Sequence, residues 1–126
     1  MQAYALTDIG RRRQVNQDYI FQSTEPVGAF PNLFILADGM GGHKAGDFAS
    51  KYLVETMVGY VSRTKINDPV RVMSNALTLS NAMIYHRSME DEDLSGMGST
   101  LVAAVIEEDL LTVCNVGDSR LYLIRD

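Results

Sequence analysis

Short apolar runs predict strands near both ends of the chain, and none in its middle. They cover residues 4–10, 18–24, 33–38, 99–106, 110–116 and 120–124. The run at 33–38, LFILAD, is apolar without a break up to its aspartate, which is typical of a strand buried on both faces. Short polar segments separate the last three runs and predict hairpin turns between them.

The spacing changes after Ala45, where hydrophobic residues recur every three or four positions, as on an amphipathic helix. This helix has an apolar stripe that reaches Val61, and a second helix follows it. Asp68 can cap the second helix, and Pro69 suits its first turn. The acidic segment at 89–96 is predicted to be a solvated loop. Strands, two adjacent helices and further strands indicate an α+β domain, with an antiparallel sheet packed against the helices.

Composition narrows the class of protein. With 126 residues and a mass of 13.9 kDa, the chain can form one domain with its own core. Its net charge of −5 argues against binding nucleic acid or an anionic membrane. The single cysteine, Cys114, excludes an internal disulfide and indicates a reducing compartment. Because the N-terminus lacks the pattern of a signal peptide and no apolar run could span a bilayer, we expect a cytoplasmic protein.

The segment LFILADGMGGHKAGDFAS places four glycines within eight residues after Asp38. A nucleotide-binding phosphate loop would need Gly-Lys-Ser/Thr, but Lys44 follows His43 and precedes Ala45. A second use of the glycines fits better, because Asp38 ends a strand and Gly39 lets backbone carbonyls approach a ligand. Carboxylate and carbonyl oxygens are the ligands that Mg²⁺ and Mn²⁺ prefer. A simple turn remains an equally good interpretation of this segment taken alone.

Two other segments carry candidate chemistry. RRRQVNQD places an anion-binding group, Arg13, and a carboxylate, Asp18, around one turn. NVGDSRLYLI places Asp118 in a tight turn between two apolar strands. Each has an ordinary alternative, because arginine triplets are commonly solvated and aspartate is common in hairpin turns.

Taken together and in this order, the segments TDIGRRRQVNQD, ILADGMGGHKAGDFAS, GMGSTLVA and NVGDSRLYLIRD resemble one family. The family is that of the bacterial metal-dependent Ser/Thr protein phosphatases of type 2C, also called the PPM family. The resemblance implies an antiparallel β-sandwich of two sheets flanked by helix pairs. It agrees with the α+β order of elements predicted above.

The resemblance also implies roles for particular residues. Asp38 would bridge two Mn²⁺ or Mg²⁺ ions, the Gly39 carbonyl would bind one of them, and Asp18 would hold metal-bound water. Asp118 would bind a third, weaker metal, and Arg13 would hold the phosphate. A water held between the metals would then attack the phosphorus of phosphoserine or phosphothreonine, without a covalent intermediate.

Some positions depart from the family pattern. Met40 stands where some relatives carry a histidine that acts as general acid. We expect His43 to be a loop residue. His43 and Asp47 lie four apart and could imitate a ligand pair, but a helix-capping role for Asp47 is the favoured interpretation. We expect His86, on the second helix, at the surface or its boundary.

Family members are about twice as long, and their later half holds two more metal-binding aspartates and a flap segment. We therefore interpret residues 1–126 as the N-terminal part of a single phosphatase domain that is inactive alone. A non-catalytic phosphate-binding or regulatory module is the alternative. The expected partners are proteins phosphorylated on Ser or Thr, a cognate Ser/Thr kinase, and a second copy of the chain. Self-association is expected because the strands from 99 onward are apolar on both faces.

Overall fold

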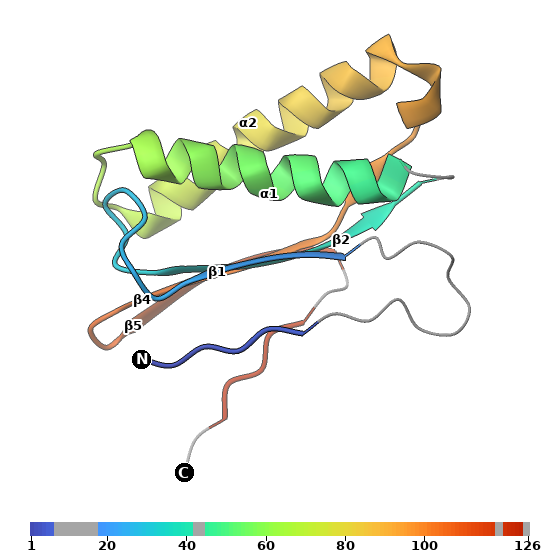
Figure 1. Cartoon of the computed structure of the whole chain (residues 1–126). Coiled ribbons are helices and arrows are strands. Elements are labelled where there is room, and N and C mark those ends of the chain that lie inside the picture. The colour runs from blue at the N-terminus through green and yellow to red at the C-terminus, as the bar shows by residue number, and fades with distance from the viewer. Residues whose placement is uncertain (7–17, 42–44, 118–119, 125–126) are drawn as a thin grey trace.

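The computed structural model describes residues 1–6, 18–41, 45–117 and 120–124. It contains a five-stranded antiparallel sheet with two helices side by side on one face (Figure 1). The long strands follow the order β1-β2-β4-β5, and the short strand β3 pairs with the end of β2. The strands are β1 (Asp18–Ser23), β2 (Leu33–Met40), β3 (Gly98–Ser99), β4 (Leu101–Glu107) and β5 (Leu110–Val116). The two segments at the chain ends run on the opposite side of the sheet from the helices (Figure 1).

The helices are α1 (Ala45–Arg63) and α2 (Pro69–Glu90). Asp68 caps α2 as predicted, because its side chain accepts a hydrogen bond of 3.3 Å from the Arg71 backbone N–H. The buried stripe of α1 includes Met57 and Val61, which are each 1% exposed. Burying a side chain of this size contributes roughly 1.5–3 kcal/mol, so contact with the sheet stabilises α1 more than helix propensity does.

Strand β2 runs through the centre of the sheet and divides its residues between two faces. Leu33, Ile35 and Ala37 belong to the core that the helices cover. Because successive strand residues point to opposite sides, Leu36 and Asp38 face away from the helices. Asp38 therefore projects from the far face of the sheet.

Asn32 joins the start of β2 to the end of β4. Its side-chain amide donates to the Ile106 carbonyl at 2.7 Å, and its side-chain oxygen accepts from the Ile106 N–H at 2.8 Å. The side chain thus imitates a strand residue and extends the pairing of β2 with β4 to two residues beyond the Phe34–Ala104 pair. Asn32 is 4% exposed, so both of its polar atoms are satisfied where water has little access.

The predicted α+β class with an antiparallel sheet against a helix pair is confirmed. A second sheet is absent from the described residues. The strand predicted at 120–124 is wrong: Arg120 and Leu121 instead border a cavity of about 200 Å³ on the far face, beside Leu36 and Val102. Residues 4–6 form no strand either, and the rest of the run at 4–10 lies outside the described residues.

The acidic segment is more ordered than predicted. α2 continues to Glu90, and a 3-10 helix spans Glu92–Leu94, whose last side chain is 8% exposed. Asp91 caps this short helix by accepting from the Asp93 N–H at 2.9 Å. Among the described residues, neither helix is long and apolar enough to cross a membrane.

Candidate metal centre

Asp38 lies near the end of β2, and its backbone is held on both sides by Thr100. The Asp38 N–H donates to Thr100 Oγ1 at 3.2 Å, and the Asp38 carbonyl accepts from the Thr100 N–H at 2.9 Å. Thr100 is 5% exposed and lies between β3 and β4. Since the Asp38 Oδ1 atom is itself buried, the carboxylate has little freedom to move away from the end of the strand.

A second carboxylate lies directly opposite the first. The register of β1 with β2 pairs Asp18 with Asp38, so their side chains leave the same face of the sheet. Directly opposed like charges destabilise an antiparallel pair, whereas a cation between them would remove this cost. The predicted association of Asp18 with the Asp38 site is therefore compatible with the backbone register.

Gly39 follows Asp38 and packs against the first turn of α1. A Cβ atom on Gly39 would overlap the Gly46 carbonyl group and lie 3.0 Å from the Gly46 Cα atom. Only glycine permits this approach of two backbones. The approach fixes the start of α1 against the end of β2.

These donors suit a hard cation in kind, since they are two carboxylates and a backbone carbonyl. They form an incomplete set, because the described residues contain no group of three or more His, Cys, Asp or Glu side chains able to hold a metal ion. Arg13, Asp118 and His43 lie outside the described residues. The roles predicted for Arg13 and Asp118 stay predictions.

The structure gives no acid–base role to Met40 or Asp47, two residues near the site. Met40 pairs with Gly98 and is 53% exposed, and its thioether cannot act as a general acid. Asp47 lies in the first turn of α1, where a negative charge is favourable at the helix N-terminus. Asp47 thus lies within the first turn of α1, after the cap position at which the predicted capping role would place it.

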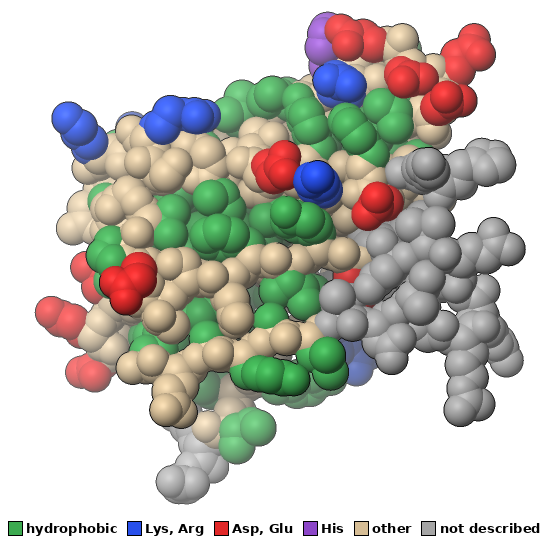
Figure 2. Space-filling view, in the orientation of Figure 1, with side chains coloured by type: hydrophobic (Ala, Val, Ile, Leu, Met, Phe, Trp, Pro, Cys, Tyr) green, Lys and Arg blue, Asp and Glu red, His purple; other side chains and the backbone are tan. Residues whose placement is uncertain are grey.

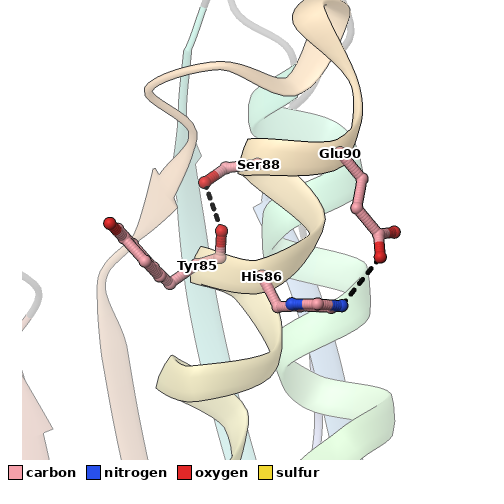
Figure 3. A network of polar contacts seen from close by, with 4 residues as sticks. All are labelled: Tyr85, His86, Ser88 and Glu90. Carbon is pink, nitrogen blue, oxygen red and sulfur yellow. Dashed lines mark hydrogen bonds and ion pairs between the residues drawn. The ribbon is translucent and has the colours of Figure 1, made fainter.

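A second group of polar side chains lies at the C-terminal end of α2. Acidic side chains are clustered in this part of the molecule (Figure 2). His86 Nε2 lies 2.7 Å from Glu90 Oε1, and the Ser88 hydroxyl donates to the Tyr85 carbonyl at 2.6 Å (Figure 3). The His86 and Glu90 side chains are 74% and 54% exposed. His86 is therefore a surface residue, as predicted, and this network stabilises the end of a helix.

Sequence reasoning did not give Thr100 or Gly46 a role. Thr100 stands between the glycine-rich GMGS and the apolar run of β4, which is the available signal for a strand junction. Neither the contact with Asp38 nor the approach of Gly46 to Gly39 could be read from spacing, because each joins segments that meet only in the folded sheet.

Comparisons with known proteins agree with this geometry. A family model described as protein phosphatase 2C matches residues 9–126. Protein phosphatase PhpP from Streptococcus pneumoniae is 37% identical over 128 residues, which cover 99% of this chain and 51% of that protein. The chain thus spans about half the length of the curated relatives it matches.

Solved structures share the fold. A serine/threonine phosphatase from S. agalactiae aligns with a TM-score of 0.75 and 39% identity, over 91% of this chain and 48% of that one. The catalytic domain of the phosphatase PstP, in complex with 2 manganese ions, aligns with a TM-score of 0.74 and 30% identity, over 88% and 45%. With a family match over nearly its whole length and the same arrangement of sheet and helices, the chain belongs to the protein phosphatase 2C family.

Proposed function

We propose that the chain forms half of the catalytic site of a phosphatase that hydrolyses phosphoserine and phosphothreonine in proteins. One observation carries the proposal: Asp18 and Asp38 lie opposite each other at the end of the sheet, and Gly39 directly follows Asp38. The named relatives are protein phosphatases, which supports this substrate class.

The metal would be Mn²⁺ or Mg²⁺. Asp38 and the Gly39 carbonyl would hold it directly, and Asp18 would accept hydrogen bonds from its bound water. When bound, such an ion lowers the pKa of a coordinated water and neutralises charge on a phosphoryl group. The manganese ions in the PstP complex support this class of metal without deciding between the two.

The chain's own residues would position the reactants. Thr100 holds the Asp38 backbone, so the carboxylate is preorganised before any ligand arrives. Arg13 would bind the substrate phosphate through two parallel hydrogen bonds, and Asp118 would bind a third, weaker metal. The proposal also predicts that the protein has a cognate Ser/Thr kinase as a partner and that it is located in the cytoplasm.

A non-catalytic phosphate-binding module is the second candidate. It is favoured by the incomplete donor set of the described residues. Affinity for Mg²⁺ and Mn²⁺ depends on accumulated carboxylates, so two carboxylates and one carbonyl would hold the ion weakly.

The chain itself provides the first test. We expect weak Mn²⁺ binding by calorimetry and little or no Mn²⁺-dependent hydrolysis of p-nitrophenyl phosphate. Asp38→Asn should remove the binding, whereas Asp47→Asn, which makes the same charge change at an exposed position of α1, should not. Binding that survives Asp38→Asn would place the metal elsewhere and contradict the proposed site.

A chimera provides the second test. Residues 1–126 would replace the matching half of the pneumococcal relative. The alignment with that relative covers 99% of this chain. We expect Mn²⁺-dependent hydrolysis of a phosphothreonine peptide, which Asp38→Asn abolishes and Asp47→Asn leaves unchanged. A folded, metal-binding chimera without hydrolysis would favour the non-catalytic module.

A further inference from the structure

The first turn of α1 contacts the backbone that directly follows Asp38. Gly46 lies against Gly39, and a Cβ atom on Gly41 would lie 2.9 Å from the Ala45 Cβ atom. These contacts leave no room for the first turn to move without moving the end of β2 as well. The position of the Gly39 carbonyl group therefore depends on where α1 begins.

The sheet holds the first two turns of α1 through little apolar surface. Their buried residues all have small side chains or none, and they are Ala45, Gly46, Ala49 and Ser50. Larger buried side chains begin at Leu53. Because the free energy of burial follows apolar area, the sheet holds the first two turns less strongly than the rest of the helix.

Two aromatic rings supply a larger contact on the flank of the same turns. Phe48 and Tyr52 lie one turn apart, and their rings stack with centroids 5.3 Å apart and an interplanar angle of 17°. Arg87 lies in the last turn of α2, which runs beside α1 (Figure 1). Its Cζ atom lies 5.2 Å from the Phe48 centroid and 5.8 Å from the Tyr52 centroid, within the range of a cation–π interaction. All three residues are half-buried, which strengthens this interaction relative to an exposed one.

We propose that Arg87 is a positioning residue of the candidate metal centre. By its contact with Phe48 and Tyr52 it holds the start of α1 against the end of α2, and so keeps Gly46 against Gly39. Arg87 itself binds neither metal nor substrate. Its effect on metal binding rests on the proposed function, whereas its contact with α1 does not.

Hydrogen exchange of the chain without metal tests the contact. In an α-helix the Ala49 N–H donates to the Ala45 carbonyl, so its exchange reports opening of the first turn. We expect Arg87→Ala to speed exchange of the Ala49 amide roughly three- to tenfold relative to the Val61 amide. Arg63→Ala is the matched control, because it removes the same side chain from the last turn of α1 and should leave this ratio unchanged. An unchanged ratio in Arg87→Ala overturns the proposal.

A second substitution tests whether the rings carry the effect. Phe48→Leu keeps an apolar side chain and removes one ring, so it should speed exchange of the Ala49 amide in the same way as Arg87→Ala. The double variant should add little to either single change, because both remove the same contact. Fully additive effects would show that Arg87 does not act through Phe48, and they would overturn the proposal.

Mn²⁺ binding distinguishes positioning from charge. Arg87→Ala removes a positive charge, and Coulomb's law alone predicts that a cation then binds more tightly. We expect the opposite, a dissociation constant for Mn²⁺ raised roughly threefold or more, measured by electron paramagnetic resonance of free Mn²⁺. Arg87→Lys keeps a cation over the rings and should restore most of the affinity, and Arg63→Ala should not weaken it.

The outcomes separate this inference from the proposed function. Unchanged or tighter Mn²⁺ binding by Arg87→Ala overturns the positioning role while the metal site stands. A wild-type chain that binds no Mn²⁺ contradicts the proposed function, and with it the role of Arg87 at a metal centre. Faster exchange of the Ala49 amide in Arg87→Ala would then still establish the contact between the two helices.

Discussion

Replacing Gly39 with alanine is expected to destabilise the fold through a single methyl group. The added Cβ would overlap the Gly46 carbonyl group, which belongs to the backbone of α1 and cannot rotate away as a side chain can. Relief requires α1 to shift along the sheet or β2 to bend, and either movement disturbs the packing of Ala37 and Ala49, which are both 0% exposed.

The magnitude follows from two opposing terms. Overpacking of a well-packed contact typically costs about 1–3 kcal/mol, and a clash between two backbones belongs at the upper end. The lower entropy of the unfolded alanine chain offsets roughly 0.4–1 kcal/mol of this cost. We therefore expect Gly39→Ala to reduce the free energy of unfolding by about 2 kcal/mol or more. At roughly 4 °C per kcal/mol, the melting temperature should fall by about 8 °C.

Urea unfolding followed by circular dichroism measures this change, with Gly59→Ala as the control. Gly59 lies inside α1, where an added Cβ would meet only the flexible guanidinium of Arg63 at 3.4 Å. The same substitution should there stabilise the chain by about 0.5–1 kcal/mol, because alanine is the better helix former. Equal effects of the two substitutions, or an unchanged midpoint for Gly39→Ala, would refute the close approach of Gly39 to Gly46.

Three further outcomes are expected. In the chimera, Asp38→Asn should lower kcat/KM for a phosphothreonine peptide by at least about a thousandfold, because the amide removes a metal-binding charge; steady-state kinetics measures this. Asn32→Ala should cost about 1–3 kcal/mol in urea unfolding, because it leaves the Ile106 N–H and C=O without the amide. Burial raises the pKa of the Cys114 thiol above its ordinary value, so the folded chain holds less thiolate at pH 8 than the unfolded chain. Iodoacetamide should therefore label Cys114 more slowly in buffer than in urea, as mass spectrometry would report.

The spacing of hydrophobic residues predicted the helices and strands that bury one face, or both faces, in the core. The stripe through Met57 and Val61 placed α1, and the unbroken apolar run at 33–38 placed β2, because each pattern reflects contact with one continuous core. The run at 120–124 carried the same apolar signal yet forms no strand. An apolar run shows that a segment needs cover, and here Leu121 borders a cavity on the far face of the sheet while it stays 38% exposed.

The sequence indicated which residues could bind a metal, but it did not indicate the contacts that hold those residues in place. Asp38 and Gly39 stand out because a carboxylate ends an apolar run and a glycine follows it. The alignment of Asp18 with Asp38 depends on the register of two strands, which the turn between them does not reveal. The contacts of Thr100 with Asp38 span 62 residues of sequence, a separation over which local patterns carry no information.

That separation has a kinetic consequence. Both helices are inserted between β2 and β4, so pairing these strands closes a loop of 62 residues at an entropic cost of order 4 kcal/mol. The α1–α2 pair and the β4–β5 hairpin close much shorter loops and should form earlier. The pairing of β2 with β4 is then a late event of folding. The Asp38 backbone becomes ordered only when its hydrogen bonds with Thr100 form. Pulsed hydrogen exchange should find the Thr100 amide protected after the amides of α1, and simultaneous protection would show that folding begins at this seam.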